Sequence, residues 1–140
     1  MRLSGLSEDP GGRAVNATAE SGNATVPLDI GTIRETAAIL LGPDDAPDAV
    51  PPAPGELDTL TAMLRGHMEL LIPKVAAKAG RLPRDSVPRY CALACVGEAR
   101  RKQRLGDGCM PPVRVAVARK LARCVKALCD HYENLDAEQP

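Results

Sequence analysis

The sequence predicts an all-α protein, a small bundle of three main helices and one short N-terminal helix. Apolar residues recur every three or four positions through most of residues 56–135, and no segment alternates apolar and polar residues between strand-like bounds. The chain has 140 residues, no Phe, no Trp and two Tyr. We therefore expect one domain whose core consists of aliphatic side chains, Met and Cys.

In the N-terminal part of the chain we expect little packed structure apart from the short helix. Residues 1–28 are rich in Gly, Ser, Asn, Thr and Ala without a helical or strand period, which indicates a disordered tail. Within residues 29–42, a helix is predicted over 32–41, because Thr32 and Glu35 have the spacing of a capping box and Gly42 begins a Gly-Pro stop. Residues 43–55 hold five Pro and three Asp, which predicts an extended acidic linker.

The three main helices are predicted within a domain over residues 56–135. The first covers about 56–80, and Pro73 inside it should produce a kink or a restart, because Pro lacks the backbone N–H. The second covers about 86–105, begins near Asp85 or Ser86 with Pro88 in its first turn, and ends before residues 106–108 (Gly-Asp-Gly). The third covers about 111–134, and residues 136–140 are expected to be disordered.

The stretch from Tyr90 to Gly97 predicts an interface. It carries no charge on any side of the expected helix for eight residues. A helix that is apolar all round is either central in a bundle or covered by a second chain. Because a domain of about eighty residues cannot readily bury one of three helices, we expect a protein partner or a homodimer at this segment.

The net charge is zero, but the two ends of the chain have opposite signs. Residues 1–56 hold three Arg and nine acidic residues, whereas residues 57–140 hold fifteen basic and nine acidic residues. The basic half can attract polyanions such as nucleic acid, an acidic protein, or the acidic N-terminal segment of its own chain. The candidate binding residues are Arg89, Arg100, Arg101, Lys102, Arg104, Arg119 and Arg123. The alternative for the run at 100–104 is a solvated helix end, stabilised by the helix dipole.

Candidates for catalysis or metal binding are few, and no cofactor is expected. His67, Glu69 and His131 are the acid–base candidates, although each His also fits an apolar helical stripe as a half-buried, hydrogen-bonded residue. Cys91 and Cys95, four residues apart, are the candidate metal ligands. Together with residues 67–69 (His-Met-Glu) they resemble part of the nucleotide-deaminase signature, but the required Pro-Cys-x-x-Cys turn is missing. Reduced Cys in an apolar helix is the alternative.

No apolar run approaches the roughly 18 residues that cross a bilayer, and residues 1–12 lack the apolar stretch of a secretory signal. These absences predict a cytoplasmic protein without membrane association. In that compartment, and with an odd number of Cys, no disulfide framework is expected.

Three stretches resemble one family: residues 65–73 (RGHMELLIP), 88–101 (PRYCALACVGEARR) and 118–135 (ARKLARCVKALCDHYENL). They are similar to small actinobacterial proteins, mostly from Streptomyces, of unknown function and labelled as natural-product biosynthesis proteins. The resemblance covers about residues 57–135 and implies a role in secondary metabolism without an assigned reaction. We expect a non-enzymatic, dimeric accessory or interaction protein. The alternatives are a small DNA-binding or transcription-associated regulator that uses the basic end of the helix over 86–105, and an enzyme.

Overall fold

The computed structural model describes residues 28–43 and 50–138. Within these ranges the chain forms four helices and no strand: α2 (Ile30–Leu41), α3 (Pro54–Gly80), α4 (Val87–Gln103) and α5 (Pro111–Glu138). The predicted all-α bundle with a short N-terminal helix is confirmed. Residues 1–27 and 139–140, for which disorder was predicted, and residues 44–49 of the predicted acidic linker lie outside the described residues.

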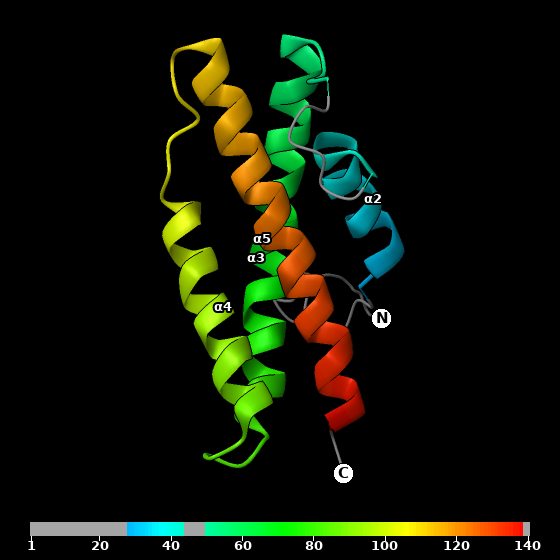
Figure 1. Ribbon diagram of the computed structural model, residues 1–140, viewed down its shortest axis with the longest axis vertical. Helices are drawn as coiled ribbons and strands as arrows, with labels where there is room; N and C mark the ends of the chain where they lie inside the picture. Colours follow the sequence, from blue (N-terminus) through cyan, green and yellow to red (C-terminus); the bar gives the residue numbers. More distant parts are fainter. Residues whose placement is uncertain (1–27, 44–49, 139–140) are drawn as a thin grey trace, which may run out of the picture.

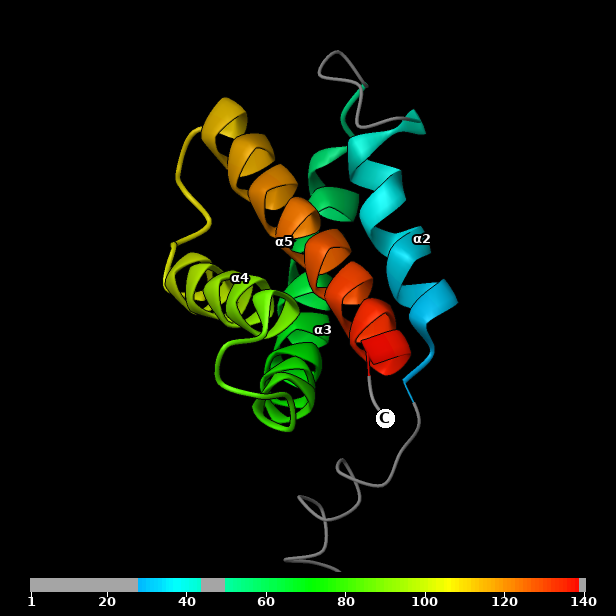
Figure 2. The same cartoon turned by 60° about the horizontal axis from the view of Figure 1, so that its bottom comes forward.

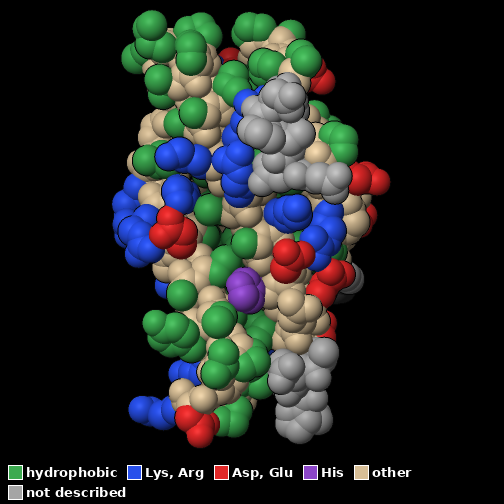
Figure 3. All heavy atoms as spheres, viewed as in Figure 1, with side chains coloured by type: hydrophobic (Ala, Val, Ile, Leu, Met, Phe, Trp, Pro, Cys, Tyr) green, Lys and Arg blue, Asp and Glu red, His purple; other side chains and the backbone are tan. Residues whose placement is uncertain are grey.

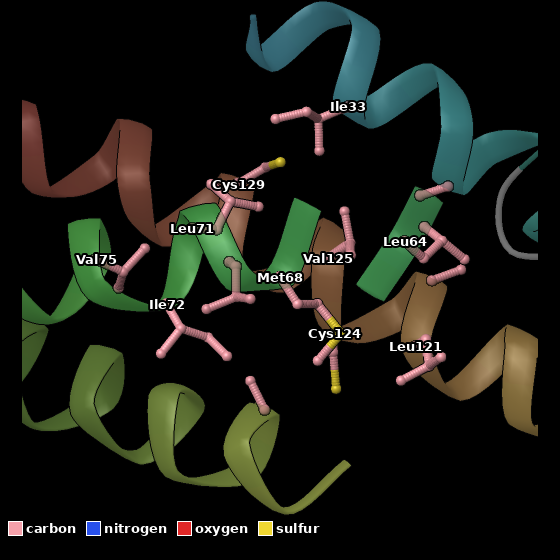
Figure 4. Packing of buried hydrophobic residues seen from close by; sticks show 14 of the residues in the cluster. Ile33, Leu64, Met68, Leu71, Ile72, Val75, Leu121, Cys124, Val125 and Cys129 are labelled. Carbon is pink, nitrogen blue, oxygen red and sulfur yellow. The ribbon is translucent and has the colours of Figure 1, made fainter. Parts of the chain in front are cut away.

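The long helices α3 and α5 form the centre of the bundle. They run side by side in the same direction, while α2 and α4 run the opposite way and lie on opposite sides of this pair (Figures 1 and 2). The buried side chains of the pair are mostly aliphatic. Figure 4 shows Leu71, Met68 and Val125 meeting between the two helices, with Ile33 of α2 above them and Ile72 directed towards α4. The core is thus built without buried aromatic rings among the described residues.

Helix α4 contributes few side chains to this core. Its buried residues are Ala92, Val96 and Ala99, compared with nine buried residues on α3. Small buried side chains let α4 pack closely, but they cover only one narrow side of the helix. Helix α4 is therefore peripheral. Of the two positions that its apolar sequence allowed, the central position in the bundle is excluded.

The helix starts agree with the sequence at α4 and differ at α2 and α3. Helix α3 begins at Pro54, so the extended linker predicted over 43–55 is wrong for residues 54–55, where Pro occupies the first turn of the helix. The Ser86 side chain caps α4 by accepting from the Arg89 backbone N–H at 3.2 Å, with Pro in the first turn as expected. Helix α2 begins two residues before the predicted Thr32, because the carboxylate of Asp29 accepts from both the backbone N–H and the hydroxyl of Thr32. The prediction that Thr32 itself caps the helix is wrong: an ionised carboxylate three residues earlier takes that place.

The last helix extends beyond its predicted end. Helix α5 continues to Glu138, so the disorder predicted from residue 136 is wrong for residues 136–138. Leu135 is buried, and the Asp136 carboxylate pairs with Lys78 of α3. These tertiary contacts stabilise a last turn that the local sequence alone does not support.

Helix α3 contains Pro73 and continues through it to Gly80, so the helix does not restart there.

Candidate interaction surfaces on helices α4 and α5

The outer side of α4 presents large apolar side chains to solvent. Val87 is 69% exposed, Tyr90 75% and Leu93 37%, and Cys91 and Ala94 are also exposed. Val87, Tyr90, Ala94 and Gly97 follow one another at spacings of three or four residues, so they form one line along the helix. We call these four residues the apolar stripe. The outer side of the predicted interface segment is therefore exposed in the part of the chain that the structure describes.

Two arginines hold α4 against α3 at its two ends. Arg65 of α3 donates to the carbonyls of Gln103 at 3.0 Å and Leu105 at 2.6 Å, beyond the last turn of α4, and pairs with Asp107 at 2.8 Å. At the other end, one guanidinium nitrogen of Arg89 lies 3.2 Å from each of the carbonyls of residues 79, 80 and 82. Each arginine donates to carbonyls at or just beyond the end of a helix, where few backbone N–H groups are available as partners.

The basic residues predicted as a binding set fall into two groups. Arg89 is half-buried and caps α3, so its guanidinium is turned away from the other candidates. The remaining six lie on α4, just after it, and on α5. The two helices pack against each other in opposite directions, so that the C-terminal end of α4 lies beside the middle of α5 (Figure 1). Arg119 is half-buried and donates to the Leu40 carbonyl of α2 at 3.4 Å. Figure 3 shows Lys and Arg side chains gathered in a band across the middle of this face. Lys120 and Lys126 of α5 were not among the predicted binding residues, although both are exposed within the same segment.

One carboxylate lies among these cations. Glu98 pairs with Lys102 and, at 2.5 Å, with Arg101. The hydrogen bonds from Lys102 and Arg101 lower the pKa of the Glu98 carboxyl to about 2. Glu98 therefore stays ionised and neutralises part of the basic surface.

The acid–base candidates do not form a site. His67 is half-buried on α3, and its Nε2 atom is buried without a hydrogen-bond partner in the described part of the chain. Burial lowers the pKa of His67, so the ring is neutral at physiological pH. The predicted hydrogen bond at this atom is absent from the described residues. Glu69 is exposed two positions further along the same helix and therefore points to another side, and His131 is half-buried on α5.

The cysteines are free thiols in apolar surroundings. Cys91 is exposed and Cys95 half-buried, and no group of three or more potential metal-ligating side chains occurs among residues 28–43 and 50–138. Burial, with a smaller contribution from the neighbouring Cys124, raises the pKa of Cys95 to about 11. A protonated thiol is a poor ligand and a poor nucleophile. Among the described residues, Cys91 and Cys95 are therefore not joined by a third potential ligand.

The fold defines a small helical bundle with one peripheral helix that is apolar on its outer side at one end and basic at the other. The chain belongs to a family of unknown function (DUF6415), whose model matches residues 31–137. This match includes the short helix and the linker, which the sequence resemblance left out. No curated protein and no solved structure matches the chain. None of the described helices combines the length and the apolar character that crossing a membrane requires.

Proposed function

We propose that this protein is a non-enzymatic accessory protein that acts through protein–protein contacts, and that the apolar stripe of α4 pairs with the same stripe of a second copy. The observation that carries this proposal is the exposure of Val87 and Tyr90 on a helix whose buried side holds only three residues. Water contact of such a line of apolar side chains is unfavourable by roughly 25 cal/mol per Å², and a partner removes it.

The order of large and small residues in the stripe favours an antiparallel pair. When the two helices run in opposite directions and cross near Ala92, Tyr90 lies opposite Ala94 of the second copy, and Val87 opposite Gly97. Each large side chain then meets a small one. Gly97 has room on its outer side, since a Cβ atom there would approach only the end of Arg101, at 3.8 Å.

Charge supports the same orientation. The stripe continues into Arg101, which is 63% exposed in its side chain. In a parallel pair the two Arg101 side chains would face each other and repel. In the antiparallel register Arg101 lies within about one turn of the exposed Asp85 at the start of the other helix. This isologous arrangement closes after two copies, so it forms a dimer and not a filament.

The test is the molar mass in solution, measured by analytical ultracentrifugation of the full chain from low micromolar to near-millimolar concentration. We expect a dimer for the natural sequence and a monomer for Ala94→Arg, which places a charged, bulky side chain in the middle of the stripe. The control is Ala62→Arg at an alanine on α3 that is also exposed, and it should leave the dimer intact. A monomer of the natural sequence at every concentration contradicts the proposal, as does equal dissociation of both variants.

Two further parts of this proposal concern its setting. The likeness of residues 65–73, 88–101 and 118–135 to actinobacterial proteins labelled for natural-product biosynthesis supports a role in secondary metabolism of such an organism. The five free thiols support a reducing compartment, the cytoplasm. Deletion of the gene in a producing strain should change the yield of one secondary metabolite, and an unchanged metabolite profile would contradict the role.

A further inference from the structure

The tertiary structure joins two basic segments into one surface. Arg100, Arg101, Lys102 and Arg104 occupy the C-terminal part of α4 and the residue after it, and Arg119, Lys120, Arg123 and Lys126 lie on α5. We call these eight residues the basic band. Because α4 and α5 run in opposite directions, the two segments lie beside each other although about twenty residues of sequence separate their centres.

The basic band carries a large excess of positive charge. From residue 98 to residue 129 the acidic residues are Glu98 and Asp107. Glu98 pairs with two of the eight cations, and Asp107 pairs with Arg65, which lies outside the band. Residues 98–104 and 119–126 together hold eight basic residues and one acidic residue, a formal net charge of +7. The field of such a surface attracts anions over about one Debye length, near 8 Å at physiological salt.

The chemistry of the band favours a polyanion over a protein partner. Protein interfaces have an apolar centre. The exposed large apolar residues of the described chain lie elsewhere, and none falls within residues 98–104 or 119–126. Arg100, Arg104, Lys120 and Lys126 are all exposed, so ammonium and guanidinium groups form the accessible surface.

The aromatic residues decide between a single strand and a duplex. Single-stranded nucleic acid is held by bases stacked on aromatic rings. The chain has no Phe and no Trp. Tyr90 belongs to the apolar stripe at the other end of α4, and the ring of Tyr132 is covered by the Lys78 ammonium, whose nitrogen lies 3.5 Å from the ring centre. A duplex needs no stacking, because its phosphates alone bind cations.

We infer that the basic band binds the phosphate backbone of double-stranded nucleic acid without reading its sequence. This binding is independent of the proposed dimer: of the eight band residues, only Arg101 and Arg104 continue the line of the apolar stripe, and the four on α5 lie on another helix. A monomeric protein would bind DNA through the same residues, so failure of one proposal leaves the other standing.

The test is fluorescence anisotropy of a labelled DNA duplex of mixed sequence, titrated with the full chain at several salt concentrations. We expect binding at low salt. The logarithm of the binding constant should fall linearly with the logarithm of the salt concentration. Lys120→Gln combined with Lys126→Gln should weaken binding and reduce this slope by about 2, roughly 1 for each lost phosphate contact. The matched control combines Arg81→Gln with Arg84→Gln, two exposed cations at the turn between α3 and α4, and should keep the natural slope.

Three results would overturn the inference. The first is no binding of the duplex at low salt. The second is an equal loss of slope in the double variant and in the control, which would show that total charge and not the basic band is responsible. The third is displacement of the duplex by an equal charge concentration of polyglutamate, which would assign the band to an acidic protein.

Discussion

Arg65 is predicted to be the most important single polar side chain for holding α4 in place. Its guanidinium donates to the carbonyls of Gln103 and Leu105 and pairs with Asp107, and its side chain is 23% exposed. A hydrogen bond from a charged donor contributes about 1.5 kcal/mol at the lower end of its range. The half-exposed ion pair adds less than about 1 kcal/mol. Replacement of Arg65 by Met should therefore cost about 3 to 4 kcal/mol in the free energy of unfolding.

This cost is measurable by urea unfolding followed by far-ultraviolet circular dichroism. It corresponds to a fall of roughly 12 to 16 °C in the melting temperature, at about 4 °C per kcal/mol for a domain of this size. Asp107→Asn removes the ion pair alone and should cost less than about 1 kcal/mol. Arg104→Met, which replaces an exposed arginine, serves as the control and should change stability by under about 0.5 kcal/mol. A cost for Arg65→Met no larger than that for Arg104→Met would refute the reasoning.

Three other predictions concern the core, the loop before α5 and pH. Gly108 has φ +91°, and a Cβ atom there would lie 2.6 Å from Cγ1 of Val113. Gly108→Ala should therefore lower the free energy of unfolding, measured by urea titration, by at least about 1 to 2 kcal/mol. Gly106 has open space around it, so Gly106→Ala should be nearly neutral in the same titration. Leu71 is fully buried; Leu71→Ala should cost about 2 to 5 kcal/mol, and a smaller loss for Leu71→Ala than for Leu71→Val would contradict its place in the core. Burial lowers the pKa of His67 in the folded state from 6.5, so the unfolded chain binds the proton more readily and stability falls as the pH drops below 6.5. His67→Leu should reduce this loss of stability in thermal melts. An unchanged pH profile of the melting temperature would show that His67 does not cause the loss.

Local sequence patterns predict where the helices lie because helix starts and stops depend on neighbouring residues. Ser86 followed by an early Pro marks the start of α4, and the Gly-Asp-Gly segment at 106–108 marks the end of the region. The same reasoning fails by two residues at α2, where Asp29 caps in place of Thr32. It also ends α5 too early, since Leu135 and Asp136 are held by contacts with the rest of the bundle.

The candidate surfaces follow from the sequence only in part. An uncharged run at Tyr90 to Gly97 indicates either a central helix or a covered one, and the packing of α4 through three small or medium side chains makes it peripheral. The local sequence does not predict which basic residues bond to carbonyls at helix ends and which face the solvent. Arg65 and Arg89 resemble the other arginines in the sequence, yet each bonds to carbonyls at the end of another helix.

By itself, the sequence determined the helical class, the approximate helix limits, the aliphatic composition of the core and the opposite charges of the two halves. These properties depend on backbone periodicity, capping and composition, all of which act over a few residues. The tertiary structure alone decided which side of α4 is covered, which arginines are used as caps, and that two distant basic segments form one band. Those outcomes depend on contacts between residues far apart in the chain, whose direction and distance are set only when α3, α4 and α5 pack together.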